Sequence, residues 1–169
     1  PYMPNGYWSG YFNGSTDYLT VPANAAFSFG TGDFTVEAWV YTTNPANTYG
    51  KIIIDARPDN TNGAYWLFGV TNNGEATFVT MATGGVTLTS PSAIPFNQWV
   101  HVAATRASGS LNLWVNGVSV ASASNNTDNI SSGILKIGTN AFRSTAPETY
   151  FLGNISNTRI VKGTAVYTS

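Results

Sequence analysis

The chain carries eight acidic side chains and one histidine, the residue types on which hydrolytic chemistry most often depends. Hydrolysis of a glycosidic bond needs two carboxyl groups roughly 5 to 9.5 Å apart, commonly held by one strand with acids at alternate positions. No two acids of this chain lie two residues apart. Glu37, in FTVEAWV, is the one acid well inside a predicted strand, and we expect a solvated or structural role for it. The acids therefore do not favour a hydrolase.

The single histidine, His101, is the only base available to a Ser-His-Asp relay, and a typical zinc site would need more imidazoles. In WVHVAATR it shares a strand face with Thr105, opposite Val100, Val102 and Ala104. We expect a hydrogen-bonded histidine packed on a sheet. The chain has no cysteine, so a thiol nucleophile and a thiolate metal site are excluded. These absences predict a protein that is not an enzyme.

Aromatic and amide side chains gather in the loop from Asp55 to Tyr65 (DARPDNTNGAY), the longest and most polar loop in the first half of the chain. Aromatic rings pack on the apolar face of a sugar, and Asn or Asp side chains bind its hydroxyl groups. We therefore predict a ligand site that includes Asp59, Asn60, Tyr65 and Trp66. Trp66, which follows the loop, is the preferred platform for a sugar ring.

The surface chemistry excludes two classes of partner. Charged residues make up 9% of the chain, the net charge is −1, and the seven Lys and Arg residues are spread singly. Without a basic stripe to neutralise phosphates, we expect no nucleic-acid partner. Without a run of about 18 apolar residues, we expect no membrane insertion. A surface of Asn, Thr, Ser and Gly suits an extracellular or virion location.

The elements that must position these residues are strands. Apolar and polar residues alternate in short segments that Gly, Asn, Pro or Asp interrupt, and no segment predicts a helix. The predicted strands are Asp17 to Val21, Phe34 to Thr42, Lys51 to Ala56, Ala64 to Thr71, Glu75 to Ala82, Val86 to Thr89, Trp99 to Arg106, Leu111 to Val115, Val118 to Ala123, Leu135 to Gly138 and Tyr150 to Val161. So many strands in one domain predict two stacked sheets or a barrel. The opening residues PYMP suggest that residues 1–169 are one domain cut from a longer chain.

One hairpin is predicted in detail. Asn116-Gly117, inside LNLWVNGVSVAS, is the pair that tolerates the positive φ angles of a two-residue type I′ turn. This turn places Val115 opposite Val118 and Leu113 opposite Val120, as one apolar stripe. Trp114 and Ser119 then point to the other face.

Four segments resemble, in order, the laminin-G-like jelly-roll domains of the concanavalin A-like lectin and glucanase superfamily. They are YFNGSTDYLTVP (11–22), GDFTVEAWVYT (32–42), NQWVHVAATRASGSLNLWVNGVSV (97–120), and LKIGTNAF with YFLGNISNTRIVKGTAVY (135–142 and 150–167). The last segment also resembles domains of marine bacteriophage structural proteins and of large secreted bacterial proteins. The resemblance implies an all-β, two-sheet antiparallel jelly-roll β-sandwich whose terminal strands lie side by side. It also implies that Trp99 is a buried structural residue.

The resemblance extends to a calcium site. Pentraxins, which share the jelly roll, hold calcium with an Asp-Asn pair, and Asp59-Asn60 matches that pair. The second half of their site is an acidic loop, but here the matching loop, TNAFRSTAPE, offers Asn140 and places the cation Arg143 nearby. The resemblance therefore implies that a double calcium site is lost, because calcium prefers several charged oxygens. A single weaker site involving Asp17 or Asp59 and a plain turn after Pro58 remain alternatives.

The predicted function is a noncatalytic module that binds a glycan or another surface ligand as part of a larger secreted or virion protein. The candidate ligand-binding residues are Asp59, Asn60, Tyr65, Trp66, Asn140 and Arg143. Calcium, held by Asp59 or Asp17, is the one candidate cofactor, and none is required. The first alternative is an assembly domain that contacts neighbouring protein chains, and the second is a degenerate glycoside hydrolase.

Overall fold

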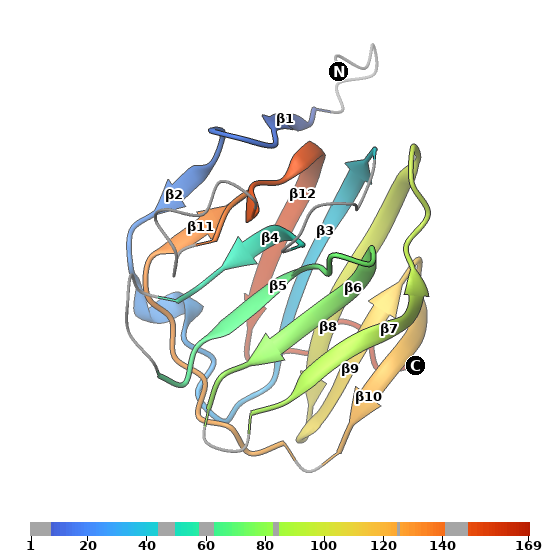
Figure 1. Cartoon of the computed structure of the whole chain (residues 1–169). Coiled ribbons are helices and arrows are strands. Elements are labelled where there is room, and N and C mark those ends of the chain that lie inside the picture. Colours follow the sequence, from blue (N-terminus) through green and yellow to red (C-terminus); the bar gives the residue numbers. More distant parts are fainter. Residues whose placement is uncertain (1–7, 44–49, 58–62, 83–84, 125, 141–148) are drawn as a thin grey trace.

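The protein is described by a computed structural model, which covers residues 8–43, 50–57, 63–82, 85–124, 126–140 and 149–169. The strands are β1 (Gly10–Asn13), β2 (Leu19–Val21), β3 (Phe34–Thr42), β4 (Lys51–Asp55), β5 (Trp66–Val70), β6 (Glu75–Thr80), β7 (Thr87–Ala93), β8 (Trp99–Ala107), β9 (Ser110–Val115), β10 (Val118–Ala123), β11 (Leu135–Ile137) and β12 (Leu152–Lys162). They form two antiparallel six-stranded sheets that stack face to face (Figure 1). Sheet A has the order β1-β12-β3-β8-β9-β10, and sheet B has the order β2-β11-β4-β5-β6-β7. The expected all-β jelly-roll sandwich is confirmed.

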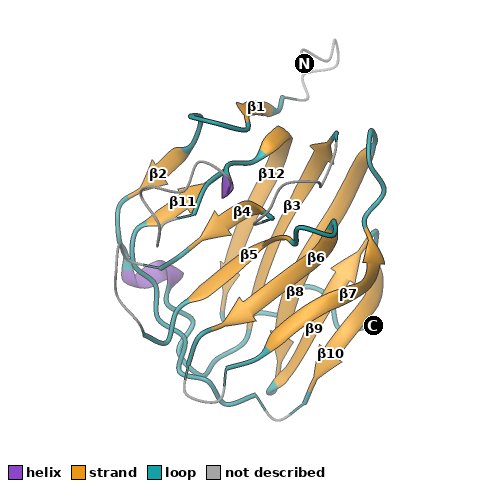
Figure 2. Cartoon of the chain, in the orientation of Figure 1, coloured by secondary structure: helices purple, strands orange, loops and turns teal. Residues whose placement is uncertain are grey.

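The strand prediction from periodicity holds across both sheets. Each predicted strand is present, and all but one of the predicted ends lie within two residues of the observed end. The exceptions include β1, which was not predicted as a separate strand, and β7, which continues to Ala93 through Pro91. Pro91 is tolerated there because β7 is the edge strand of sheet B and needs no further hydrogen-bonded neighbour. In the described part of the chain the helical residues are 3₁₀, in the turn Ala25–Phe27 and at Thr149 (Figure 2), and no helix is long and apolar enough to span a membrane.

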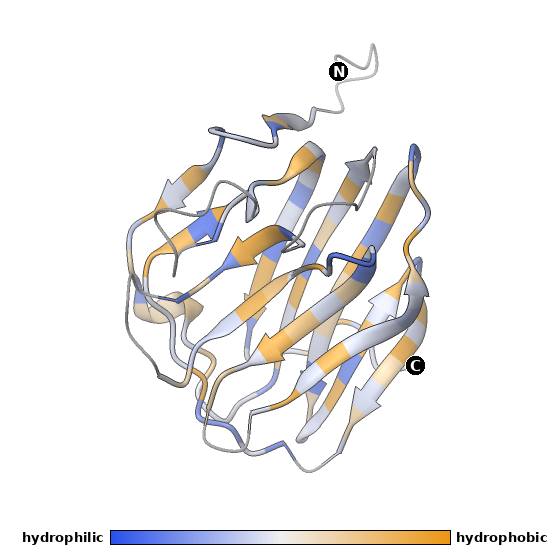
Figure 3. Cartoon of the chain, in the orientation of Figure 1, coloured by the Kyte–Doolittle hydropathy of each residue, from blue (hydrophilic) through white to orange (hydrophobic). Residues whose placement is uncertain are grey.

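The core lies between the sheets and is dominated by aromatic rings. Hydrophobic and hydrophilic residues alternate along the strands, so that one face of each sheet can turn inward (Figure 3). Phe34, Trp66 and Phe78 are fully buried. The ring of Phe29 stacks on Phe34 at 4.2 Å and on Trp66 at 5.2 Å between centroids. This aromatic stack ties sheet A to sheet B.

A buried arginine holds the loops at one end of the core. Arg106, at the end of β8, has no exposed surface. Its guanidinium donates hydrogen bonds to the carbonyl oxygens of Gly30 (2.6 Å) and Gly32 (2.6 and 2.9 Å). It also donates to Asn126 Oδ1 and to the carbonyl oxygen of Asp128, both at 2.9 Å. One side chain therefore joins the segment before β3 to the loop after β10.

The predicted turn of the β9–β10 hairpin is confirmed, but its register is not. Asn116 and Gly117 have φ angles of 50° and 80°, as a type I′ turn requires, and Val115 pairs with Val118. A β-bulge after Ser119 then places Ala121, not Val120, opposite Leu113. The predicted Leu113–Val120 pair is wrong because the bulge inserts one extra residue into β10.

The strands near the two ends of the chain pair, as expected. β1 adds to sheet A beside β12, with Tyr11 opposite Asn154 and Phe12 opposite Gly153. The Phe12 side chain turns inward and is 4% exposed. Tyr11 points to the opposite face, since successive residues of a strand alternate in direction.

Candidate functional site

The outer face of sheet A, which is the face turned away from sheet B, carries aromatic and charged side chains at its centre. In β3, Val36, Ala38 and Val40 point into the core and are completely buried. Glu37 and Trp39 alternate with them and therefore point outward. The face of β3 that points into the core is therefore apolar, and its outer face carries the carboxylate of Glu37 and the indole of Trp39.

Cross-strand pairing brings the histidine to the same place. His101 in β8 pairs directly with Trp39, and their rings lie 5.3 Å apart between centroids. Trp39 is 40% exposed, so much of its ring remains open to solvent. The prediction that His101 packs on a sheet as a hydrogen-bonded side chain is confirmed, because its Nε2 lies 3.2 Å from Glu37 Oε2.

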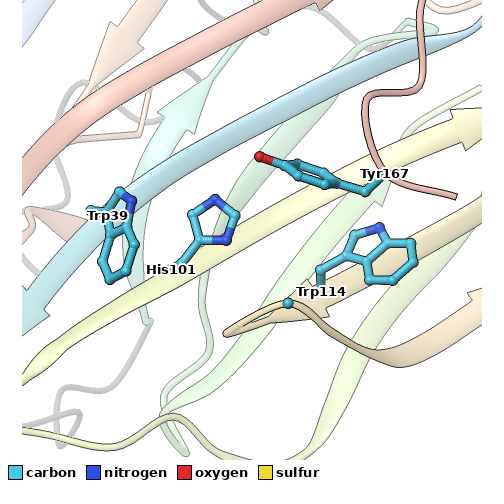
Figure 4. Close-up of a pocket in the computed structure, with 5 residues that line it drawn as sticks. Trp39, His101, Trp114 and Tyr167 are labelled. Atoms are coloured by element: carbon cyan, nitrogen blue, oxygen red, sulfur yellow. The ribbon is translucent and has the colours of Figure 1, made fainter. Parts of the chain in front are cut away.

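The segment after β12 completes the site with Tyr167. This segment crosses the outer face, where Val166 N donates to Thr35 Oγ1 at 2.8 Å and Thr35 Oγ1 donates to the Thr164 carbonyl at 3.0 Å. The Tyr167 ring consequently lies 5.9 Å from the His101 ring and 6.3 Å from the Trp114 ring (Figure 4). We call Trp39, His101, Trp114 and Tyr167, together with Glu37 and Arg159, the aromatic site.

Two adjoining hollows open at the aromatic site. The first has a volume of about 220 Å³ and is lined by Trp39, His101, Trp114, Gly117 and Tyr167. The second has a volume of about 530 Å³ and is lined by Glu37, Trp39, His101, Asn157, Thr158, Arg159 and Tyr167. Ligand pockets commonly have volumes of about 300 to 1,000 Å³. The first hollow is bounded mainly by rings, and the second adds hydrogen-bonding side chains.

Glu37 is the charged centre of the site. Its carboxylate accepts hydrogen bonds from the Arg159 guanidinium and the Tyr167 hydroxyl, and His101 lies within hydrogen-bonding distance. Burial alone would raise the pKa of Glu37, but the hydrogen bonds from Tyr167 and Arg159 and the charge of Arg159 outweigh burial and lower the pKa. The hydrogen bond to Glu37, with burial, raises the pKa of Tyr167. Glu37 is therefore an ionised acceptor that orients three surrounding groups.

The structure corrects the predicted role of Trp66. Trp66 begins β5, is completely buried, and stacks on Phe29 in the core. Its ring has no face available to a sugar, so the prediction of a Trp66 platform is wrong. Alternation explains the placement, because Trp66 shares a strand face with Phe68 and Val70, which are also buried.

The other predicted site residues are only partly described. Asp59, Asn60 and Arg143 lie outside the described residues. Tyr65 is half-buried at the start of β5. Asn140 Oδ1 accepts a hydrogen bond from Arg57 Nη2 at 2.9 Å, so that the strand end before residues 58–62 contacts the segment after β11.

The second predicted metal ligand, Asp17, lies in the turn between β1 and β2. Its Oδ2 accepts from the backbone N–H of Asn13 at 3.1 Å, and its Oδ1 accepts from Thr16 Oγ1 at 3.4 Å. Within the described ranges, no group of three or more His, Asp and Glu side chains is arranged to hold a metal ion.

Sequence reasoning missed Trp39, Trp114, Arg159 and Tyr167 as parts of a site. For Trp39 a signal existed, because it alternates with core residues in the strand that also carries Glu37. Trp99 was expected to be buried, but it lies half-exposed on the same outer face, 5.8 Å from the Tyr41 ring. The outer face therefore collects more aromatic side chains than the core packing requires.

The two stacked antiparallel sheets define a jelly-roll sandwich. Residues 13–165 match the model of a laminin-G family described as the concanavalin A-like lectin/glucanases superfamily. The chain belongs to this superfamily. No curated protein sequence matches the chain.

Solved structures share the fold at low sequence identity. Domain 4 of AbnA, an extracellular arabinanase from Geobacillus stearothermophilus solved with arabinotriose, has a TM-score of 0.68 and 19% identity, over 92% of this chain and 70% of that chain. The CBM40 domain of a Ruminococcus gnavus sialidase, solved with α2,3-sialyllactose, has a TM-score of 0.65 and 14% identity, over 87% and 90%. Domains LG4-5 of the mouse laminin α1 chain have a TM-score of 0.66 and 16% identity, over 91% and 41%. At these sequence identities, the similarity shows that the chain shares its fold with these domains.

Proposed function

We propose that this chain is a noncatalytic carbohydrate-binding module whose ligand lies in the aromatic site. The observation that carries the proposal is the half-exposed Trp39 ring beside the side chains of Glu37 and Arg159, in a hollow of about 530 Å³. A sugar ring has an apolar face that packs on an indole and hydroxyl groups at its edge that bind charged or amide groups. The site offers both kinds of contact at neighbouring positions.

The number of carboxyl groups at the site and the lowered pKa of Glu37 support ligand binding and not hydrolysis. Among the described residues that line the hollows, Glu37 is the sole carboxylate. Glycoside hydrolysis commonly uses two carboxyl groups, one of them with a raised pKa. The pKa of Glu37 is lowered, and its oxygens already accept hydrogen bonds from neighbouring side chains. This arrangement suits an orienting acceptor better than a proton donor.

The neighbours with the same fold support a glycan as the ligand class. The arabinanase domain was solved with arabinotriose, and the sialidase domain with sialyllactose. We further propose that the module works outside the cell or on a virion surface, as part of a larger protein. The low content of charged residues and the extracellular nature of the arabinanase support this location.

The test is a glycan array probed with the wild-type chain, Trp39→Ala and Leu19→Ala. Leu19 is 58% exposed on β2, in the other sheet, and serves as a control for loss of an exposed apolar side chain. We expect Trp39→Ala to lose binding and Leu19→Ala to bind like the wild type. Equal binding by all three chains would refute the aromatic site.

A competing location is the pair of loops predicted from the sequence. The Arg57–Asn140 hydrogen bond joins the flanks of these loops. A site there would use Asp59, Asn60 and Arg143, with or without calcium. Binding that survives Trp39→Ala but is lost in Asp59→Ala, or after addition of a chelator, would move the ligand to these loops.

A second candidate function, contact with neighbouring protein chains in an assembly, is favoured by the edge of sheet B. Tyr18 and Leu19 are 48% and 58% exposed at the edge strand β2. Light scattering over a concentration series tests this function. Assembly that Leu19→Ala disrupts, in a chain that binds no glycan, would favour it over the carbohydrate-binding module.

A further inference from the structure

Exposed aromatic side chains continue beyond the aromatic site, towards the β1 edge of sheet A. Tyr11 is 62% exposed, and Trp8, just before β1, is 69% exposed. A single exposed ring is ordinary on a protein surface, whereas a contiguous exposed apolar patch marks an interaction site. The question is whether they belong to the same surface as Trp39.

The strand register places Tyr11 in line with other outer-face rings. Tyr11 in β1 pairs with Asn154 in β12, Asn154 pairs with Tyr41 in β3, and Tyr41 pairs with Trp99 in β8. Directly paired residues lie on the same face of a sheet. One row of side chains therefore crosses four adjacent strands on the outer face.

A second row runs beside the first. Ser156 in β12 pairs with Trp39, which pairs with His101 in β8. The hydroxyl of Ser156 donates to the carbonyl oxygen of Trp8 at 2.6 Å, which fixes the Trp8 backbone at the β12 end of this row. The first row is tied down similarly, because Asn154 Nδ2 donates to Ser9 Oγ at 3.2 Å. Both rows thus connect the segment around β1 to the aromatic site.

The two rows, together with Trp114 of β9, which pairs with Ala103 of β8, form a surface that we call the aromatic band. The band is long compared with one sugar ring. From β1 through β12, β3 and β8 to β9 there are four steps between strands. At about 4.8 Å per step, the band extends over roughly 19 Å. A single monosaccharide in the hollow near Trp39 would leave Tyr11 and Trp8 without contact.

The composition of the band fits a polysaccharide chain. Hydrogen-bonding side chains such as Ser156 and Arg159 lie among the aromatic rings, and Asn154 is buried between them, so the surface is not continuously apolar. Each unit of a polysaccharide presents an apolar ring face and polar hydroxyl groups, which matches this alternation. The charges of Glu37 and Arg159 pair with each other, so the band offers no excess charge to a polyanion.

We propose that the outer face of sheet A binds an internal stretch of a neutral polysaccharide, which crosses the strands from the aromatic site to outer subsites at Tyr11 and Trp8. This inference rests on the proposed carbohydrate-binding function and adds the class of ligand and its direction. The inner end of the bound stretch contacts Trp39 and Tyr167, and the outer end contacts the β1 edge.

The experiment uses affinity electrophoresis against neutral polysaccharides, namely arabinan, xylan, mannan, β-glucan and starch. Calorimetry then follows with oligosaccharides of increasing length prepared from the polymer that binds. We compare the wild type with Trp8→Ala, Tyr11→Ala and Trp39→Ala. Tyr18→Ala is the matched control, because Tyr18 is 48% exposed but lies beside β2 in the other sheet.

We expect affinity to rise with oligosaccharide length and then to level off. Tyr11→Ala and Trp8→Ala should each weaken polymer binding about tenfold and leave the shortest binding oligosaccharide unaffected. Trp39→Ala should lose binding of both the polymer and the shortest oligosaccharide, and Tyr18→Ala should bind both like the wild type. The unfolding midpoint of each variant shows whether it is folded.

Four outcomes would overturn the inference. If the shortest sugar binds as tightly as the polymer, or if Tyr11→Ala and Trp8→Ala change nothing while Trp39→Ala abolishes binding, the outer subsites are wrong and the carbohydrate-binding function stands. If no glycan binds at all, both proposals fail. If Tyr11→Ala or Trp8→Ala instead dissociates an oligomer, a second copy of this chain covers the band.

Discussion

His101 Nε2 lies 3.2 Å from Glu37 Oε2 on the outer face of sheet A, where the two residues are diagonal neighbours on strands β8 and β3. The inward-facing residues of the same two strands form the core, so the packing that buries Val36 and Val102 also fixes these two polar groups. A side chain with its backbone in the centre of a sheet needs little additional ordering to bind a ligand. The packing of the sandwich therefore holds His101 and Glu37 in place.

Replacing Glu37 should lower the free energy of unfolding and remove part of the stability loss that the protein shows at acidic pH. Glu37→Gln removes a charged acceptor of the Arg159 and Tyr167 hydrogen bonds, and we expect the free energy of unfolding near pH 7 to fall by about 1.5 to 3 kcal/mol. The pKa of Glu37 is lower in the folded chain. Its contribution is thus complete above the unfolded pKa of about 4.3 and is lost as the pH falls through the folded value.

Urea unfolding of wild type and Glu37→Gln over a pH series measures this difference. The two stabilities should converge as the pH falls below about 4. A difference that stays constant down to the lowest pH would mean that the Glu37 charge does not stabilise the fold.

Two tryptophans that look alike in the sequence should behave differently. Trp66→Ala empties a fully buried position and should cost about 3 to 5 kcal/mol. Trp39→Ala removes a ring that is 40% exposed and should cost about 1 kcal/mol or less. Thermal unfolding of both variants gives the comparison. Equal losses would contradict the assignment of Trp66 to the core and Trp39 to the surface.

The same contrast shows what the sequence could and could not predict. Strand periodicity predicted both sheets, and Asn116-Gly117 predicted a turn, because these depend on neighbours a few residues apart. The exposure of Trp39 was also predictable, since it alternates with Val40 and Ala38. The contact between Tyr167 and Glu37 was not, because it joins residues 130 positions apart and depends on how the chain after β12 crosses the sheet.

Lys51 should make the protein more stable in mildly alkaline solution. Lys51 is 2% exposed in β4, and its Nζ donates to Thr42 Oγ1 at 2.7 Å. Burial lowers its pKa to about 8. Between this value and the unfolded pKa of about 10.4, the unfolded chain binds more protons, so stability rises with pH, by up to about 3 kcal/mol in total. Lys51→Met keeps most of the aliphatic stem and should lack this rise.

Chemical denaturation from about pH 7 to pH 9.5 of both chains measures the Lys51 effect. The wild type should gain stability relative to Lys51→Met across this interval. Parallel curves would show that Lys51 has an ordinary pKa in the folded protein.

Arg106 should be among the most sensitive positions of the fold. Its guanidinium donates to Gly30, Gly32, Asn126 and Asp128, and in Arg106→Met these buried acceptors lose a charged donor. A buried acceptor left without its donor costs about 1 to 3 kcal/mol, and several acceptors are affected at once. Arg106→Lys should recover little of the lost stability. The planar guanidinium donates to both the segment before β3 and the loop after β10, and an ammonium group cannot reproduce this geometry.

Lys162→Met provides the control for loss of a cation. Lys162 is exposed and donates one hydrogen bond to the Ala25 carbonyl, so we expect a change within about 0.5 kcal/mol. Urea unfolding followed by tryptophan fluorescence measures all three variants. If Arg106→Lys were as stable as the wild type, the charge of Arg106 alone would hold the loops, and its hydrogen-bond geometry would not matter. If Arg106→Met were also unchanged, the loops would be held by the stacking of Phe29 and Phe34 without the arginine.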